Sequence, residues 1–176
     1  LGVPGAVRAV ALPDAARATY QWGSRLPPEL ASGLEGVGHW SASPQNYPNG
    51  CYVVEVEVDP ETGIVRLDRI SGVDDVGRVI NPMIVEGQLH GGLAQGIGQA
   101  LLERTVYADG QLLSASFMDY ALPRAADLPS FASETDETQP CTHNPLGAKG
   151  CGESGAIGAP AAVVSALLDA LAPLGV

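Results

Sequence analysis

The segment GAKGCGESGAIGAPAAVV (147–164) places one acidic residue, Glu153, inside a run of glycines. Within it, Gly150 to Gly155 satisfy the pattern G-x-G-x-x-G, and an apolar run with helical spacing follows. Such a loop before a helix is typical of sites where a dinucleotide pyrophosphate rests on a helix N-terminus. The pattern is weak by itself, so the surrounding sequence has to decide what the loop does.

The surrounding sequence disfavours a dinucleotide. A Rossmann loop directly follows a buried strand, whereas TQPCTHNPLGAK (138–149) is polar and interrupted by prolines. A Rossmann fold also needs a second strand with an acidic residue about 20 positions further on, and the residues up to Val176 predict one helix instead. In addition, Glu153 would place a carboxylate beside an anionic pyrophosphate, which costs free energy.

The same carboxylate suits a general base. Small neighbours let a substrate or cofactor approach Glu153 closely, and the backbone N–H groups from Gly150 to Ser154 can tune the pKa of its side chain. The alternative is that Glu153 caps the following helix, because the helix dipole favours an acidic group at this end. Helix caps are far commoner than catalytic carboxylates, and spacing alone leaves both interpretations open.

A second glycine-rich segment, EGQLHGGLAQGIGQALLE (86–103), has the apolar spacing of a helix. Each interior glycine costs about 1 kcal/mol relative to alanine. Such a loss of helix propensity is expected where another surface, either a second helix or a ligand, approaches the backbone closely. Gln88 and Gln95 are seven residues apart on nearly the same helix face, where their amides would meet such a ligand. Both explanations of the glycines stay open.

The remaining periodicity predicts strands and helices in an α+β fold. CYVVEVEVD (51–59) alternates valine with glutamate, as a strand with one buried face does, and a second strand is predicted in IVRLDRISGVDDVG (64–77) after the turn DPETG. A long helix is predicted from Asn81-Pro82 to about Arg104. The fold class is therefore predicted as α+β, with small antiparallel sheets packed against two long helices.

Weaker signals complete the predicted secondary structure. A hairpin is predicted between Val106 and Asp119 around the turn signal Ala108-Asp109-Gly110, and the polar stretch from Phe131 to His143 predicts an irregular connection. The second long helix follows the glycine loop, and Pro160 either starts or kinks it.

The chain is predicted to comprise an N-terminal segment (1–48) and a core (49–176). The N-terminal segment is rich in proline and glycine and is expected to be irregular, apart from a short helix at Pro13–Gln21.

Charge and hydropathy exclude several classes of partner. With 20 acidic and 9 basic residues the net charge is −11, which repels a nucleic-acid backbone or an anionic membrane. No apolar run approaches the roughly 20 residues that span a bilayer, and the first residues lack the features of a signal peptide. We therefore predict no nucleic-acid partner and no membrane span.

Cysteine and histidine spacing gives no metal-binding pattern. Cys51, Cys141 and Cys151 are far apart and form no C-x-x-C pair, which argues against a disulfide framework or a structural zinc site and favours a reducing, cytoplasmic location. Glu86 and His90 would share a helix face, where a surface hydrogen bond is the expected use of the pair.

Three segments in order resemble one known family: DDVGRVINPMIVEGQLHGGLAQGIGQALLE (74–103), MDYALPRAADLP (118–129) and NPLGAKGCGESGAIGAPAAVVSALLDAL (144–171). They are similar to the C-terminal part of the molybdenum-binding large subunit of the xanthine dehydrogenase and aldehyde oxidase family, particularly to bacterial relatives of the aerobic carbon monoxide dehydrogenase large chain. The resemblance implies that residues 1–176 form a single lobe, the C-terminal half of a molybdenum-cofactor-binding domain.

The resemblance also implies a reaction and its cofactors. The expected enzyme is a molybdenum hydroxylase, an oxidoreductase that hydroxylates an aldehyde or N-heterocycle carbon, or oxidises carbon monoxide, with water as the oxygen source. Its expected cofactor is molybdenum-molybdopterin in the cytosine dinucleotide form. Electrons would pass to Fe-S clusters and FAD on partner chains. The implied partners are the remaining large-subunit segment, an Fe-S subunit and an FAD subunit.

Two motif matches carry the implied site residues. By match to the family pattern G-x-K-G-x-G-E, the resemblance implies Glu153 as the catalytic base. By match to G-G-x-x-Q-G-I-G, it implies Gln95 beside the molybdenum centre. The other implied cofactor contacts are Gly91, Gly92, Gly96, Lys149, Gly150, Cys151 and Gly152. No protein ligand to molybdenum is expected.

The chain is much shorter than a complete large subunit of that family. We expect it to be a fragment of, or a subunit within, a larger enzyme, and to be inactive in isolation. The alternative, from a different functional class, is a cofactor-free structural module that only assembles with partner chains. The sequence leaves the substrate open among aldehydes, purines, other N-heterocycles and carbon monoxide.

Overall fold

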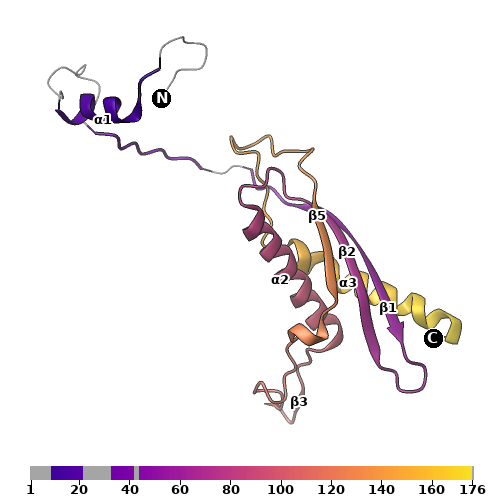
Figure 1. The fold of residues 1–176 in the computed structure, drawn as a ribbon. Helices are drawn as coiled ribbons and strands as arrows, with labels where there is room; N and C mark the ends of the chain where they lie inside the picture. Colours follow the sequence, from indigo (N-terminus) through magenta and orange to yellow (C-terminus); the bar gives the residue numbers. More distant parts are fainter. Residues whose placement is uncertain (1–8, 22–32, 42–43, 176) are drawn as a thin grey trace. The chain divides into compact units, whose positions relative to one another are not determined.

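A computed structural model describes residues 9–21, 33–41 and 44–175 (Figure 1). The chain divides into two compact units, Leu1–Ser41 and Ala42–Val176. The predicted boundary between the N-terminal segment and the core, after residue 48, lies close to this division. The irregular structure predicted for residues 1–8, 22–32 and 42–43 falls outside the described residues. The assignment of residues 1–176 to one lobe stays a prediction.

In the first unit, α1 (Leu12–Gln21) confirms the predicted short helix. Arg17 Nη1 lies 3.2 Å from Asp14 Oδ1 in an exposed ion pair within the helix. The hydroxyl of Tyr20 accepts a hydrogen bond from the backbone N–H of Leu34 at 3.4 Å. This bond ties a residue beyond the helix back to its last turn.

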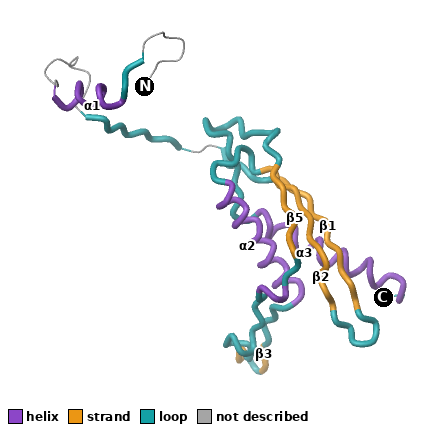
Figure 2. The backbone as a smooth tube through the Cα atoms, in the orientation of Figure 1, coloured by secondary structure: helices purple, strands orange, loops and turns teal. Residues whose placement is uncertain are grey.

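The second unit has two layers, a three-stranded sheet and a pair of helices (Figures 1 and 2). The strand order is β1 (Asn49–Val58), β2 (Val65–Asp75) and β5 (Ser130–Thr135). Strand β1 pairs antiparallel with β2, and β5 pairs parallel with it. The helices are α2 (Pro82–Leu101) and α3 (Ser154–Leu171). The predicted α+β class is confirmed.

Short elements complete the second unit. Strands β3 (Tyr107–Ala108) and β4 (Gln111–Leu112) form the predicted hairpin, and Asp109 and Gly110 at its tip have φ angles of 49° and 78°. Two left-handed residues in a two-residue loop are what a type I′ turn requires. The 3₁₀ helices are η2 (Ala125–Asp127) and η3 (Ala172–Leu174).

A β-bulge shifts the phase of β2. Glu55 pairs with Arg69 and Val56 pairs with Leu67, so Asp68 has no opposite residue. Before the bulge the more buried side chains are at odd positions, and after it they are at even positions, beginning with Ile70. The predicted strand is confirmed. The bulge moves the more buried side chains from odd to even positions, which a strict period of two does not predict.

Strand β5 lies where the sequence predicts an irregular connection. Its residues, SFASET, include one large apolar side chain, Phe131, so the alternation that marks a strand is missing. The parallel pairing with β2 is possible because α2 and the β3–β4 hairpin lie between the two strands and form a long crossover. The third strand makes the main sheet mixed, whereas the two predicted hairpins are antiparallel.

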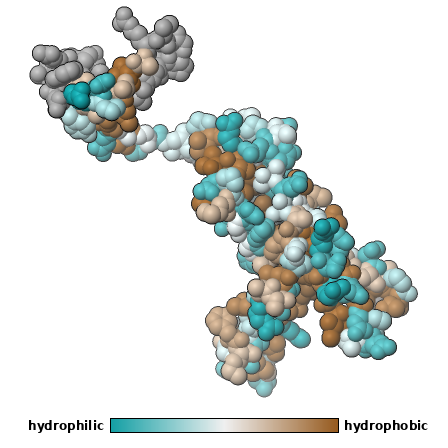
Figure 3. All heavy atoms as spheres, viewed as in Figure 1, coloured by the Kyte–Doolittle hydropathy of each residue, from teal (hydrophilic) through white to brown (hydrophobic). Residues whose placement is uncertain are grey.

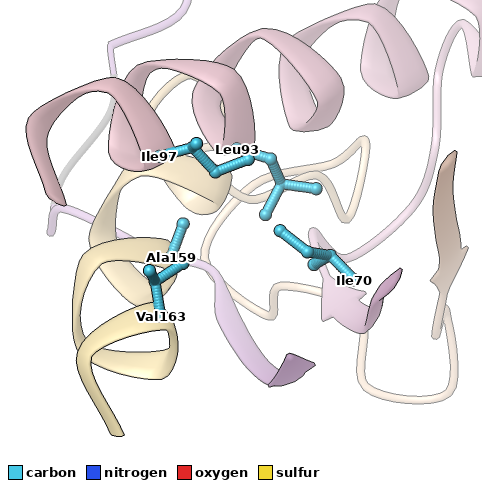
Figure 4. Packing of buried hydrophobic residues seen from close by; sticks show 5 residues of the cluster. All are labelled: Ile70, Leu93, Ile97, Ala159 and Val163. Atoms are coloured by element: carbon cyan, nitrogen blue, oxygen red, sulfur yellow. The ribbon is translucent and has the colours of Figure 1, made fainter. Parts of the chain in front are cut away.

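The core joins the two layers. Ile70 of β2 meets Leu93 and Ile97 of α2, and Ala159 and Val163 of α3 complete the cluster (Figure 4). Each of these five residues is at most 1% exposed. Burial of a large aliphatic side chain contributes about 1.5–3 kcal/mol, so this cluster holds both helices on one face of the sheet.

Glycines set the distance between α2 and α3. A Cβ atom at Gly92 would lie 2.9 Å from the backbone N of Ala156 and 3.0 Å from Cα of Gly155, and one at Gly96 would lie 2.6 Å from Cβ of Ala159. Small residues four positions apart let two helix backbones approach closely. Of the two explanations that the sequence leaves open, a second helix therefore accounts for Gly92 and Gly96.

Helix α3 is apolar enough to bear on the prediction that the chain has no membrane span. Pro160 lies inside it and not at its start. The segment Ser154–Leu174 is long and apolar enough, with a mean hydropathy of 1.7, to cross a membrane by length and composition alone. This is weak evidence for a span, because core helices meet the same criterion and Ala159 and Val163 of α3 belong to the core.

We expect Gly92→Ala to lower the free energy of unfolding by about 1–3 kcal/mol, as overpacking typically does, because its methyl group would meet the backbone of α3. Gly87→Ala is the matched control. Beyond its own turn of helix, no atom of the described residues lies within 4 Å of a Cβ at Gly87, so this change should add up to about 1 kcal/mol through helix propensity. Urea unfolding followed by circular dichroism measures both, and equal effects would contradict the packing role of Gly92.

Candidate functional site

Glu153 lies on the turn that leads into α3, and its side chain is exposed. The residue has the N-cap position, with φ −111° and ψ 0°, and its carbonyl accepts a hydrogen bond from the backbone N–H of Ile157 at 3.0 Å. Its side chain makes no capping hydrogen bond. Glu153 thus occupies the cap position, where the helix dipole favours its charge, but its exposed carboxylate makes no capping hydrogen bond.

The backbone before Glu153 is held by residues far away in the sequence. The backbone N–H of Gly150 donates to Asn46 Oδ1 at 2.9 Å, across 104 positions of the chain. The backbone N–H of Lys149 donates to the carbonyl of Val76 at 2.8 Å. We call residues 149–153 the Glu153 turn. Asn46 has no motif around it that would have predicted this contact.

Lys149 also holds the turn through its side chain. Its Nζ donates to Asp75 Oδ2 at 2.5 Å, and the two side chains are 14% and 17% exposed. The hydrogen bond from Lys149 holds the pKa of the Asp75 carboxyl below its usual value. The ammonium group is thus occupied by a partner within this chain. The predicted cofactor contact of Lys149 stays a prediction.

Two glycines with positive φ angles lie where the end of β2 meets the segment that precedes the Glu153 turn. Gly77 has φ 64° and Gly147 has φ 73°. Gly77 forms an isolated antiparallel bridge with Ala148, and the backbone N–H of Arg78 donates to the carbonyl of Gly147 at 2.9 Å. A side chain at Gly77 would be strained and would also meet the backbone N of Lys149 at 3.0 Å.

Helix α2 presents an open face beside this turn. We use this name for Gly87, Gln88, Gly91 and Gln95, which are all exposed. A Cβ atom at Gly87 or Gly91 would meet nothing within 4 Å among the described residues. Packing within the described chain therefore explains neither of these glycines.

The structure brings Gln88 closer to the turn than Gln95. Nε2 of Gln88 lies 3.8 Å from the place that a Cβ would take at Gly152. Gln95 is seven residues further along α2, or about 10 Å along the helix axis. Gln95 and Glu153 are both exposed, and no hydrogen bond joins them in the described part of the chain. Their cooperation across a cleft stays a prediction.

The other predicted cofactor contacts have different surroundings. Gly150 and Gly152 are exposed on the turn, whereas Cys151 packs against the buried cluster that contains Val85. The α3 backbone approaches Gly92 and the α3 side chains approach Gly96. For all of these residues, a contact with cofactor stays a prediction.

His90 does not pair with Glu86 as the sequence suggested. Its Nε2 lies 3.0 Å from the hydroxyl oxygen of Ser133, and its ring lies 5.3 Å from that of Phe131 between centroids. Both partners belong to β5, the strand that the sequence analysis missed. The histidine therefore helps to attach α2 to the third strand.

Residues 5–129 match the molybdopterin cofactor-binding domain family. The match includes the whole of α2 and ends before the Glu153 turn. It covers well over half of the chain.

Similar proteins extend this comparison. The chain is 43% identical to the nicotine 6-hydroxylase large subunit of Paenarthrobacter nicotinovorans, over 94% of this chain and 20% of that protein. It is 42% identical to the carbon monoxide dehydrogenase large chain of Afipia carboxidovorans, over 83% of this chain and 18% of that one. The structure of quinoline 2-oxidoreductase from Pseudomonas putida 86 matches with a TM-score of 0.82 at 44% identity, over 90% of this chain and 20% of that chain. The chain thus spans about a fifth of the length of these relatives.

Asp75→Asn should weaken the support of the Glu153 turn. Because the pKa of Asp75 is lower in the folded state, its contribution to stability is present above about pH 4 and is lost as the pH falls through the folded-state pKa. We expect the variant to lose about 1–3 kcal/mol of unfolding free energy at pH 7. The difference from the wild type should shrink below about pH 4.

Urea unfolding between pH 7 and pH 3 measures this effect. Asp169→Asn is the matched control, because Asp169 is exposed on α3 and makes no ion pair in the described structure. A loss that is the same at every pH would show that the Lys149–Asp75 pair is not its cause.

Proposed function

The chain belongs to the molybdopterin cofactor-binding domain family found in enzymes of the xanthine dehydrogenase and aldehyde oxidase type, and we propose that it is the C-terminal cofactor-binding part of a molybdenum hydroxylase large subunit. The observation that carries this proposal is an exposed carboxylate, Glu153, on a braced glycine turn beside the open face of α2. Packing of the described chain accounts for neither feature.

The residues present fit a pterin cofactor with a dinucleotide extension. Gly91 leaves the backbone of α2 open to a close approach, and Gln88 and Gln95 offer neutral donors and acceptors that suit a polar heterocycle or a phosphate. On the turn, the exposed Gly150 and Gly152 would let the same ligand reach the backbone. The cytosine dinucleotide form is part of the proposal.

The chain's own residues would contribute a base and its support. When bound, the cofactor supplies a two-electron oxidation in which water provides the oxygen. Glu153 would accept a proton from an O–H group held in front of the turn. Gln95 would orient the bound groups through its amide. Asn46 and the Lys149–Asp75 pair would fix the turn in advance, so that less ordering is needed at the moment of reaction.

The proposed substrate class is a carbon of an aldehyde or an N-heterocycle, or carbon monoxide. Nicotine 6-hydroxylase and quinoline 2-oxidoreductase, which are 43% and 44% identical to this chain, support an N-heterocycle. The residues that would choose among these substrates are not among those assigned to the site.

Exposed apolar side chains support contacts with further chain segments. On the arm that carries β3 and β4, Phe117 is 84% and Met118 is 95% exposed, and apolar residues gather on this arm (Figure 3). Large exposed apolar patches typically mark protein interfaces. The proposed partners are the remaining large-subunit segment, an Fe-S subunit and an FAD subunit, which would receive the electrons.

The three free cysteines support a cytoplasmic location.

The same exposed apolar surface would also suit the alternative function, a cofactor-free assembly module. Molybdenum analysis and pterin fluorescence of the natively purified protein with its partners distinguish the two. An enzyme part should carry both molybdenum and pterin. A protein that contains neither, although its partners are present, would be the assembly module.

Glu153→Gln tests the base. In the assembled enzyme we expect turnover to fall by at least about 10²-fold, while the molybdenum content stays close to that of the wild type, because the amide keeps the shape of the carboxylate but accepts no proton. Glu61→Gln, in the exposed turn of the β1–β2 hairpin, is the matched control and should keep full activity. Full activity in Glu153→Gln would refute the assignment.

Gly91→Leu tests the open face of α2. No atom of the described chain lies within 4 Å of a Cβ there, so the helix should stay folded, but the leucine would occupy the space assigned to the cofactor. We expect the molybdenum bound per assembled enzyme to fall severalfold. Ser165→Leu, exposed on α3, should leave it unchanged. Normal molybdenum content in Gly91→Leu would place the cofactor elsewhere.

A further inference from the structure

Strand β5 leaves one edge of the main sheet unpaired in the described structure (Figure 1). Just beyond β5, the backbone N–H of Asp136 donates to the carbonyl of Asp74 in β2 at 2.9 Å. The N–H and C=O groups of successive strand residues point to opposite edges, so those of Phe131, Ser133 and Thr135 point away from β2. Within the described residues, no hydrogen bond occupies these outward groups.

Contacts on its inner face hold β5 in place. His90 of α2 bonds the hydroxyl of Ser133 at 3.0 Å, and its ring lies 5.3 Å from that of Phe131 between centroids. The strand, SFASET, contains neither of the two residue types, proline and lysine, that commonly protect an open edge. The outward backbone groups therefore belong to a positioned strand with which a further strand could pair.

A groove lies beside this edge, between β5 and the first half of α2. Its volume is about 420 Å³, and its lining residues include Ser133, Glu134 and Thr135 but no residue of β2. From α2 it is lined by Val85 and Leu89, which are 9% and 1% exposed. In a strand added to β5, every second side chain would point toward α2. The groove thus offers an apolar floor to such side chains.

Two carboxylates give the groove a preference for a basic occupant. Glu86 and Glu134 both line it, are exposed, and make no ion pair among the described residues. A second copy that paired through the same edge would bring the same carboxylates to it, and like charges across paired strands are destabilising. A segment with a lysine or arginine beside an apolar side chain would complement both the charge and the floor.

The relatives are long enough to supply a further strand within one polypeptide. This chain covers 20% of the nicotine 6-hydroxylase large subunit and 20% of the quinoline 2-oxidoreductase chain. Pairing within one polypeptide benefits from a high effective concentration. We propose that a strand of the remaining large-subunit segment, with a basic and an apolar side chain, pairs with the open edge of β5. This inference rests on the proposed function, because it takes the chain to be part of a large subunit.

Hydrogen exchange in the assembled enzyme, read residue by residue by mass spectrometry, tests the pairing. The amides of Phe131, Ser133 and Thr135 should exchange at least about a hundredfold more slowly than those of an unstructured peptide. The amides of Ala132 and Glu134 point toward β2 and serve as the internal reference. Exchange of the three outward amides at nearly the unstructured rate, with the reference amides protected, would overturn the inference.

Thr135→Pro removes one outward N–H group and leaves the groups that face β2. In the assembled enzyme we expect the amides of Phe131 and Ser133 to exchange about tenfold faster, because the added strand loses one hydrogen bond. Thr135→Ala is the matched control, since it keeps the N–H group and should leave this exchange unchanged. An edge that faces water tolerates proline, so equal exchange in the two variants would contradict the added strand.

Photo-crosslinking identifies the occupant. Ala132 is exposed on β5, and p-benzoylphenylalanine in its place would lie next to an added strand. In the assembled enzyme we expect a cross-link to a peptide of the remaining large-subunit segment. The absence of a cross-link, or a cross-link only to a separate subunit or to a second copy of this chain, would overturn the assignment.

Molybdenum and pterin analysis of the same sample separates this inference from the proposed function. An enzyme that carries both molybdenum and pterin but has an open β5 edge would refute the added strand alone. A paired edge in an assembled protein that contains neither would refute the enzymatic function and leave the strand in place.

Discussion

The close contact between α2 and α3 is the constraint on which the second unit depends. Gly92 and Gly96 of α2 face Gly155 and Ala159 of α3, and one added methyl group at these glycines would meet backbone or proline atoms. The contact also positions the functional surface. Glu153 precedes Gly155 by two residues, so the packing that fixes the helices also fixes the turn that presents the carboxylate.

Two adjacent carboxylates at the end of β2 have different surroundings. Alternate residues of a strand point to opposite faces, so Asp74 lies beneath Ser154 while Asp75 reaches Lys149. Their pKa values shift in opposite directions, and the causes differ. The ammonium of Lys149 lowers the pKa of Asp75, whereas burial raises that of Asp74. The Lys149–Asp75 pair thereby braces the chain just before Glu153.

Local sequence patterns account for much of the fold. The two long helices, the β1–β2 hairpin and the β3–β4 turn follow from apolar periodicity and turn residues, which act between near neighbours. The same reasoning missed strand β5 because a short strand beside a parallel neighbour needs little alternation of apolar and polar residues. It also missed the bulge at Asp68 because strand register depends on the partner strand.

For the candidate site, the sequence by itself determined that a carboxylate stands on a glycine turn before a helix, and that α2 is unusually rich in glycine. Only the tertiary structure decided which glycines serve packing and which stay open. It alone paired Lys149 with Asp75, brought Asn46 to Gly150 and placed Gln88 nearer the turn than Gln95. The physical reason is distance along the chain. Helical and strand periods fix which side chains share a face, whereas contacts across some 60 to 100 positions exist only after the helices and the sheet have packed.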